Sequence, residues 1–216
     1  MPEEIFQKLA QAVIDGESED AETLARQALE LGLEPLDCIN EGLTKGIQHV
    51  GEQFADVECF LPELVLSANA MKIALSVLEP AMLGGKQREI VGKVVIGTVQ
   101  GDLHEIGKNL VGTMLIANGF HVIDLGVDTP VSEFIRAIKE NNATIVGASA
   151  LLTTTMIEQK NLVDAIKEAG LREQVKVMIG GAPVNQDYSN QIGADGYAEN
   201  AVAAVNLAFR LADAPK

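Results

Sequence analysis

The chain has 216 residues, of which 47% are hydrophobic and only 4% aromatic, and its formal net charge is −15. So acidic a surface repels phosphate backbones, which argues against nucleic-acid binding. No uninterrupted apolar run reaches the ~18 residues of a membrane span, and the start lacks the features of a signal peptide. Cys38 and Cys59 have neither metal-ligand nor disulfide spacing. We therefore expect a soluble, cytoplasmic protein with no membrane partner.

The first part of the chain, residues 1–85, predicts only helices. Apolar residues recur there at helical spacing, Ser18 is placed to cap one helix, and Pro35 suits the start of another. The expected helices cover about residues 5–15, 18–31, 35–54 and 61–83. Their similar lengths and short loops indicate a four-helix bundle. This part holds 16 acidic and 4 basic residues, which suits either solubility or docking to a basic partner.

The pattern changes after a linker expected at residues 86–92, with a hinge near Gly84-Gly85. From residue 93 to 216, short β-branched runs alternate with amphipathic segments of helix length. The expected strands are 93–98, 121–124, 145–149, 176–179 and a short one near 196–197. The expected helices start near Ile106, Pro130, Thr155, Pro183 and Asn200. This alternation predicts a doubly wound, flavodoxin-like sheet of five parallel strands in the order 2-1-3-4-5.

The loop after the first expected strand contains Asp102 and His104, at the edge where such sheets bind ligands. Three interpretations of this loop are open. It is an incidental polar loop, a phosphate-binding loop, or a metal-binding His whose second ring nitrogen donates to a carboxylate. The glycines match no G-x-G-x-x-G or Walker pattern, which weakens the phosphate interpretation. His49 and His121 lie at no zinc-ligand spacing from His104, so a single His implies a metal held mainly by another group.

Three short motifs in register make the metal interpretation specific. Asp102-x-His104-x-x-Gly107 is followed after 41 residues by Ser149-x-Leu151, and after 28 more by Gly180-Gly181. This pattern resembles the signature of cobalamin-binding proteins that bind the cofactor base-off and His-on, as in the cobalamin-binding module of methionine synthase.

The helical part resembles the cap that precedes this domain in corrinoid-dependent methyltransferase proteins. The match runs from Gly51-Glu52-Gln53-Phe54 to Phe60-Leu61-Pro62-Glu63-Leu64. The resemblance thus covers nearly the whole chain and is strongest to the corrinoid proteins of three-component methyltransferase systems. A helical cap over residues 1–85 and a Rossmann-like corrinoid-binding domain over residues 93–216 are expected from it.

The resemblance implies a role for each matching residue. His104 replaces the cofactor's own benzimidazole as the axial cobalt ligand, and Asp102 binds the distal nitrogen of its ring. Thr155 extends this pair where methionine synthases have Ser. Ser149 hydrogen-bonds the displaced tail base, and Thr153 lines the same slot. Leu103, Ile106, Gly107, Leu151, Gly180 and Gly181 complete the expected cofactor contacts, the two last by leaving room for the tail base.

The cap residues Phe54, Leu61 and Leu64 match those that shield the upper cobalt face, although helical spacing alone also suits a core role. The implied cofactor is cobalamin or a related corrinoid, which alternates between methylcobalamin and cob(I)alamin. The implied partners are a substrate-specific methyltransferase, an acceptor methyltransferase using tetrahydrofolate or a thiol, and a reductive activation protein. The chain is then a cofactor-carrying component, not a complete enzyme. A cobalamin-dependent sensor and the small subunit of an adenosylcobalamin mutase are the alternatives.

Overall fold

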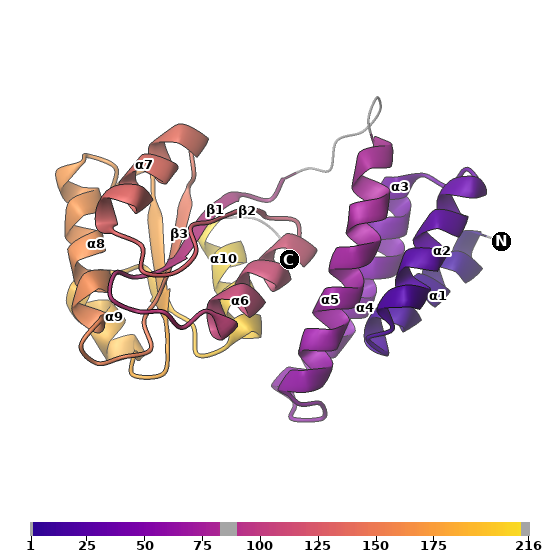
Figure 1. Ribbon diagram of the computed structural model, residues 1–216, viewed down its shortest axis with the longest axis horizontal. Helices are drawn as coiled ribbons and strands as arrows, with labels where there is room; N and C mark the ends of the chain where they lie inside the picture. The colour runs from indigo at the N-terminus through magenta and orange to yellow at the C-terminus, as the bar shows by residue number, and fades with distance from the viewer. Residues whose placement is uncertain (1, 83–89, 213–216) are drawn as a thin grey trace. The chain divides into compact units, whose positions relative to one another are not determined.

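The computed structural model describes residues 2–82 and 90–212 of the chain. Two compact units are present, with the division between Glu89 and Ile90 (Figure 1). The first unit is helical, and the second holds a sheet flanked by helices. The predicted hinge at Gly84-Gly85 lies outside the described residues, as does most of the predicted linker. At its end, Val91 and Gly92 are already hydrogen-bonded to backbone groups of the second unit.

The helical unit confirms the helical character predicted for the first part of the chain. Its elements are α1 (Pro2–Ile14), α2 (Ser18–Glu30), α3 (Pro35–Asp37), the π-helical segment η1 (Cys38–Leu43), α4 (Thr44–Ala55), α5 (Leu61–Leu78) and the 3-10 turn η2 (Glu79–Met82). The stretch from α3 to α4 is continuous, but the π-helical turn within it was not predicted. Ser18 is the first residue of α2, not its cap, because its hydroxyl accepts a hydrogen bond from the Asn69 amide (3.1 Å).

Two glycines explain how closely α1 packs against η1 and α4. A Cβ atom at Gly46 would lie 2.6 Å from the carbonyl oxygen of Ala10, and one at Gly42 would lie 3.0 Å from the Cβ of Leu9. Any larger residue would push the helices apart. The apolar positions predicted at helical spacing, including Leu9, form the buried core of this unit.

Helix α5 continues into η2 to form the most apolar segment of the helical unit. Among the described residues, Leu61–Met82 is the one helix long and apolar enough to cross a membrane, with a mean hydropathy of 1.4. The expectation from uninterrupted runs missed it because Glu63 and Lys72 interrupt the segment. A stripe of α5 that includes Leu64 and Met71 is fully buried in the protein. In total 44% of this segment is buried within the protein.

The second unit is a parallel five-stranded sheet in the predicted order β2-β1-β3-β4-β5. Its strands are β1 (Lys93–Thr98), β2 (His121–Asp124), β3 (Ile145–Ser149), β4 (Lys176–Gly180) and β5 (Gly196–Tyr197). Its helices are α6 (Ile106–Ala117), α7 (Val131–Asn141), α8 (Met156–Glu168), α9 (Gln186–Ile192) and α10 (Ala201–Leu211). Helix α9 begins after Pro183, because the Asn185 side chain caps it by accepting from the Tyr188 N–H (2.9 Å).

Helices cover both faces of this sheet (Figure 1). Helices α7 and α8 supply Phe134, Ile138, Leu162 and Ile166 to a buried cluster with the strands, while α6 and α10 pack together on the other face. Strands β1, β3 and β4 are buried along most of their length, whereas the edge strand β2 is exposed at both ends. Only the loops at the strand ends are therefore free to carry a site.

Candidate functional site

Two loops at the carboxyl edge of the sheet carry most of the predicted site. They are the β1 loop (residues 99–105) and the β3 loop (residues 150–155). Strands β1 and β3 are neighbours, so Thr98 pairs with Ser149 where both strands end. The N–H of Val99 then donates to the carbonyl oxygen of Ser149 (3.0 Å). Topology thus brings together two segments that lie about 50 residues apart in the sequence.

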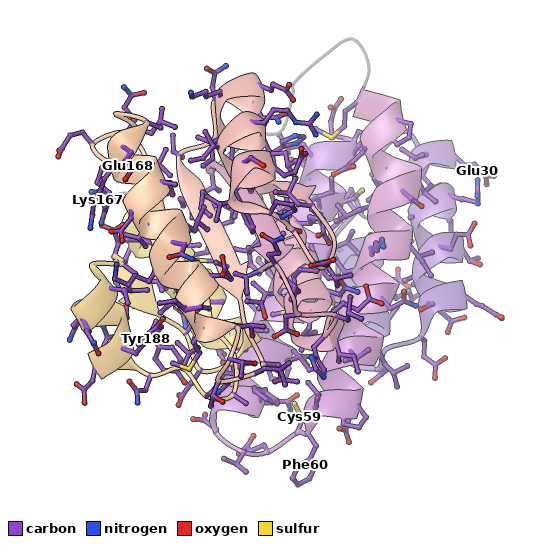
Figure 2. The ribbon with its side chains drawn as sticks, turned by 60° about the vertical axis from the view of Figure 1, so that its left-hand side comes forward. Glu30, Cys59, Phe60, Lys167, Glu168 and Tyr188 are labelled. Atoms are coloured by element: carbon purple, nitrogen blue, oxygen red, sulfur yellow. The ribbon has the colours of Figure 1, made fainter. Side chains whose placement is uncertain are left out.

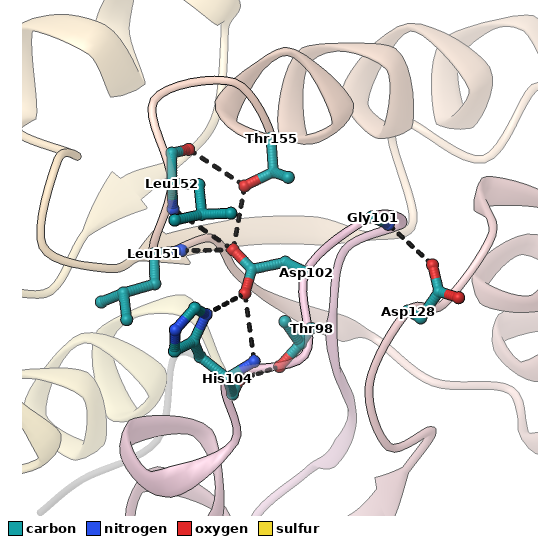
Figure 3. Close-up of polar contacts among 8 residues, drawn as sticks. All are labelled: Thr98, Gly101, Asp102, His104, Asp128, Leu151, Leu152 and Thr155. Carbon is teal, nitrogen blue, oxygen red and sulfur yellow. Dashed lines mark hydrogen bonds and ion pairs between the residues drawn. The ribbon is translucent and has the colours of Figure 1, made fainter.

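The carboxylate of Asp102 joins the two loops (Figure 3). This side chain is fully buried. Its Oδ1 accepts hydrogen bonds from His104, through the ring Nδ1 (2.7 Å) and the backbone N–H (3.1 Å). Its Oδ2 accepts from the N–H groups of Leu151 (2.7 Å) and Leu152 (3.3 Å) and from the Thr155 hydroxyl (2.9 Å). The buried charge is therefore fully compensated by donors.

These donors decide the charge of Asp102. Burial acts to raise the pKa of its carboxyl group, but the hydrogen bonds from His104, Leu151 and Thr155 outweigh burial and hold the pKa well below its usual range. Asp102 is consequently ionised at neutral pH. An ionised carboxylate only accepts hydrogen bonds, so it fixes which nitrogen of the His104 ring carries a hydrogen.

The ring of His104 is held on one side and open on the other. Its side chain is 52% exposed although its partner carboxylate is buried. The hydroxyl of Thr98 donates to the carbonyl oxygen of His104 (2.8 Å), which fixes the backbone as well. With Nδ1 donating to Asp102, the neutral ring keeps its lone pair on Nε2. This arrangement is that of a metal-binding histidine with a carboxylate behind it.

Exposed apolar side chains occur in the β1 loop, at the start of α6 and in the β3 loop. Leu103 is 71% exposed, Ile106 is 78% exposed and Leu151 is 40% exposed. A Cβ atom added at Gly107 would meet nothing within 4 Å. Exposed leucine and isoleucine beside an imidazole gain stability only when another apolar surface covers them. The residues present fit a large, mostly apolar ligand that brings its own metal.

The residues predicted to line a tail slot lie at or just beyond the ends of β3 and β4. Ser149 is half-buried at the end of β3 and pairs with Gly180, and Thr153 is exposed in the β3 loop. Gly181 has a φ of +126°, and a Cβ atom there would lie 1.8 Å from the carbonyl oxygen of Ala150. The backbone of the β3 loop therefore requires this glycine, whether or not a tail base lies nearby.

The predicted cap residues belong to the helical unit and differ in exposure. Leu61 is 45% exposed, Phe54 is partly buried, and Leu64 is fully buried on the core stripe of α5. Phe60, which belongs to the stretch that matches the cap, projects outward just before α5 (Figure 2). Sequence reasoning did not name Val57, which is exposed and has a φ of +62°.

Sequence reasoning named Thr155, but it did not predict the backbone donors of the β3 loop or Asp128 beside the β1 loop. The N–H of Leu152 has no sequence signal, because every residue but proline carries such a donor. Asp128 accepts a hydrogen bond from the N–H of Gly101 (2.7 Å), and its place after a strand could have suggested it. No group of three or more His, Cys, Asp or Glu side chains that could hold a metal occurs among the described residues.

Comparisons with known proteins cover both units. Residues 5–79 and 92–206 each match a family described as B12 binding domain. A corrinoid protein of Desulfitobacterium hafniense is 46% identical over 209 residues, which are 96% of this chain and 97% of that protein. The trimethylamine corrinoid protein of Methanosarcina barkeri is 46% identical over 204 residues, 94% of each chain.

Two solved structures extend the similarity to the fold. A chain of the methanol:cobalamin methyltransferase complex of Methanosarcina barkeri has a TM-score of 0.86 and 32% identity, over 99% of this chain and 81% of that one. A cobalamin-binding protein of Desulfitobacterium hafniense has a TM-score of 0.77 and 35% identity, over 94% of this chain and 96% of that one. This chain therefore belongs to the B12-binding corrinoid proteins of methyltransferase systems.

Proposed function

We propose that this corrinoid protein carries methyl groups between two methyltransferases, and that the Nε2 atom of His104 would bind the cobalt of its cofactor. Bound corrinoid supplies a cobalt ion that accepts and releases a methyl group. The observation that carries the proposal is the His104–Asp102 pair, in which an exposed ring is locked by a buried, ionised carboxylate. In this mode His104 displaces the cofactor's benzimidazole, so binding is base-off and His-on.

The proposed role of Asp102 is to orient the imidazole and to raise its basicity. Hydrogen bonding of Nδ1 to a carboxylate makes Nε2 a stronger ligand. The hydroxyl of Thr155 donates to Asp102 (2.9 Å) and links this pair to the start of α8.

The proposed contacts with the rest of the cofactor divide between two sets of residues. Leu103, Ile106, Gly107 and Leu151 offer exposed apolar or open surface to the corrin ring. Ser149, Thr153, Gly180 and Gly181 lie at the ends of β3 and β4 and suit the displaced tail. The roles of Phe54, Leu61 and Leu64 in excluding water from the reactive side stay a proposal that rests on the resemblance.

The proposed partners follow from the named relatives. One similar chain belongs to a methanol:cobalamin methyltransferase complex, and others are trimethylamine and dimethylamine corrinoid proteins. We infer a methyltransferase that loads a methyl group from a small donor of the methanol or methylamine type, an acceptor methyltransferase, and a reductive activation protein.

The test is the absorption spectrum of the purified protein after reconstitution with methylcobalamin. Wild-type protein is expected to show the spectrum of a histidine-ligated, base-displaced cofactor. His104→Gly is expected to bind the cofactor without that ligand, and added imidazole is expected to restore the wild-type spectrum. His121→Gly, which removes an exposed His on β2, is the control and should leave the spectrum unchanged. A His104→Gly spectrum identical to that of the wild type would disprove the assignment.

A further inference from the structure

A third loop lies against the β1 loop on the side away from β3. Strand β1 lies between β2 and β3 in the sheet, and the β2 loop (residues 125–130) continues alongside β1. The N–H of Thr98 donates to the carbonyl oxygen of Gly126 (2.9 Å), and the N–H of Thr129 donates to the carbonyl oxygen of Thr98 (3.0 Å). The β1 loop is therefore held between two neighbouring loops.

The β2 loop is itself anchored by an ion pair between a buried lysine and an exposed aspartate. Lys108 of α6 has a side chain that is only 1% exposed, and its Nζ donates to both oxygens of Asp124 (2.7 and 2.6 Å). Asp124 Oδ1 also accepts from the N–H of Gly126 (2.8 Å). Since α6 begins directly after the β1 loop, this pair ties the start of the β2 loop to the same region of the fold.

Within the β2 loop, Asp128 forms two hydrogen bonds with the β1 loop, and Figure 3 shows the one made by its side chain. Its Oδ1 accepts from the N–H of Gly101 (2.7 Å), and its own N–H donates to the carbonyl oxygen of Asp102 (2.9 Å). The two hydrogen bonds hold the Gly101–Asp102 segment from the side opposite to the donors of the β3 loop. The side chain of Asp102 is thus fixed through its carboxylate, and its main chain is fixed by Asp128.

Asp128 adopts a conformation that most residues avoid. Its φ is +50°, in the left-handed region where non-glycine residues are uncommon. Asp and Asn tolerate this region better than other residues with a side chain, and glycine tolerates it best. Glycine, however, has no oxygen to accept the Gly101 N–H. The residue present combines the required backbone geometry with the required acceptor, and strain kept at a site points to function.

We propose that Asp128 is a positioning residue of the cofactor site. It fixes the Gly101–Asp102 segment, and through it the carboxylate of Asp102 and the orientation of the His104 ring. Asp128 itself contacts neither the metal nor its ligand atom. The part of this inference that concerns metal ligation rests on the function proposed above, whereas the part that concerns the β1 loop does not.

Three substitutions separate the acceptor from the backbone conformation. Asp128→Asn keeps an Oδ1 acceptor and a residue that tolerates positive φ. Asp128→Gly keeps the conformation but removes the acceptor. Asp128→Ala removes the acceptor and adds strain. A positioning role predicts that Asn behaves like the wild type and that Gly and Ala both fail. A role in backbone conformation alone predicts that Gly behaves like the wild type.

Asn142 supplies the matched control. It ends α7 with a φ of +51°, nearly the same as that of Asp128, and lies outside the three loops. Asn142→Ala introduces similar backbone strain at a distance from the site. Asn142→Ala is expected to lower the free energy of unfolding about as much as the strain added by Asp128→Ala. It is expected to leave the exchange of the Gly101 amide and the affinity for aquacobalamin unchanged.

The first readout is hydrogen exchange of the Gly101 amide, measured by NMR on cofactor-free protein. Exchange is expected to be at least ~10-fold faster in Asp128→Gly and Asp128→Ala, and within ~3-fold of wild type in Asp128→Asn, because only the last keeps the acceptor. Unchanged exchange in Asp128→Gly would overturn the proposal even if ligation by His104 is confirmed.

The second readout is titration with aquacobalamin, followed by the absorption of the histidine-ligated form. Asp128→Gly and Asp128→Ala are expected to weaken formation of that form by ~10-fold, the lower end of the range for partners behind a metal ligand. Equal affinity in Asp128→Gly and wild type would overturn the link to ligation. If His104→Gly itself has the wild-type spectrum, the proposed function fails instead, and the exchange measurement alone still decides the role of Asp128 in the loop.

Discussion

The β1 loop and the β3 loop meet at one carboxylate but contribute in different ways. The β1 loop supplies chemistry through its side chains, Asp102 and His104. The β3 loop supplies two backbone N–H groups, of Leu151 and Leu152, and a single hydroxyl, of Thr155. One loop therefore depends on which residues it contains, and the other depends mainly on the path of its backbone.

This difference predicts how substitutions in each loop affect the site. In the β1 loop, a change of side chain alters the reactive group directly. In the β3 loop, most side chains can change without effect on the carboxylate, provided that the backbone donors stay in place. Substitutions in the two loops and at the end of β4 test this contrast between side-chain and backbone contributions.

Gly181→Ala places a methyl group just after β4, against the backbone of the β3 loop. Because the new Cβ atom would lie 1.8 Å from the carbonyl oxygen of Ala150, we expect a loss of more than about 4 kcal/mol in the free energy of unfolding. Gly170→Ala is the control for a positive-φ glycine without a close contact, since its φ is +69°, against +126° at Gly181, and a Cβ atom there would meet nothing within 4 Å. It should cost only about 1 kcal/mol. Urea unfolding measures both, and equal losses would refute the backbone argument.

Asp102→Asn removes the buried charge that the β1 loop contributes. An Asn amide keeps the shape but places a donor against the N–H groups of Leu151 or the ring of His104. We expect a loss of about 3 kcal/mol in the free energy of unfolding, together with loss of the histidine-ligated spectrum. Asp164→Asn, on the exposed side of α8, should change the unfolding free energy by less than about 0.5 kcal/mol. A loss as small as that of the control would contradict the role of the buried charge.

The pH dependence of stability tests whether Asp102 is ionised in the folded chain. The pKa of Asp102 is lower in the folded chain than its usual value. The stabilisation from its charge is then complete above about pH 5 and declines as pH falls through the unfolded-state pKa of ~3.9 towards the folded-state pKa. The difference in unfolding free energy between wild type and Asp102→Asn should fall by about 1 kcal/mol between pH 5 and pH 3. Urea unfolding at each pH tests this, and a constant difference would show that Asp102 is not selectively ionised in the fold.

Thr155→Val removes the one side-chain donor that the β3 loop region gives to Asp102. The change keeps the shape and leaves the backbone donors, so we expect a loss of only about 1 kcal/mol in the free energy of unfolding. Thr155→Ser keeps the hydroxyl and should recover most of that loss. Thermal unfolding of the cofactor-free protein distinguishes them. An effect of Thr155→Val as large as that of Asp102→Asn would mean that the hydroxyl, not the backbone, dominates on this side.

Much of the fold could be predicted because it follows from periodicity. Alternating apolar strands and helices determined the five strands and their order, since parallel crossovers allow few arrangements. The π-helical turn at Cys38–Leu43 could not be predicted, because it depends on how closely α1 approaches Gly42 and Gly46. The start of α9 was misplaced because Asn185, not Pro183, caps it.

The site divides along similar lines. The pairing of Asp102 with His104 could be predicted because two residues of matching chemistry lie two positions apart on one loop. The donors from Leu151 and Leu152 could not, because backbone groups leave no mark in a sequence. The role of Gly181 was predicted for a different reason, namely room for a ligand. Its positive φ and its approach to Ala150 became visible only in three dimensions.

The strands at the two ends of the sheet are its shortest, with four residues in β2 and two in β5. A long open strand at either end would offer unpaired N–H and C=O groups to any other extended chain. Short end strands limit such adhesion between molecules. The proposed carrier function would benefit from this geometry, because a protein that meets several partners in turn must release each of them.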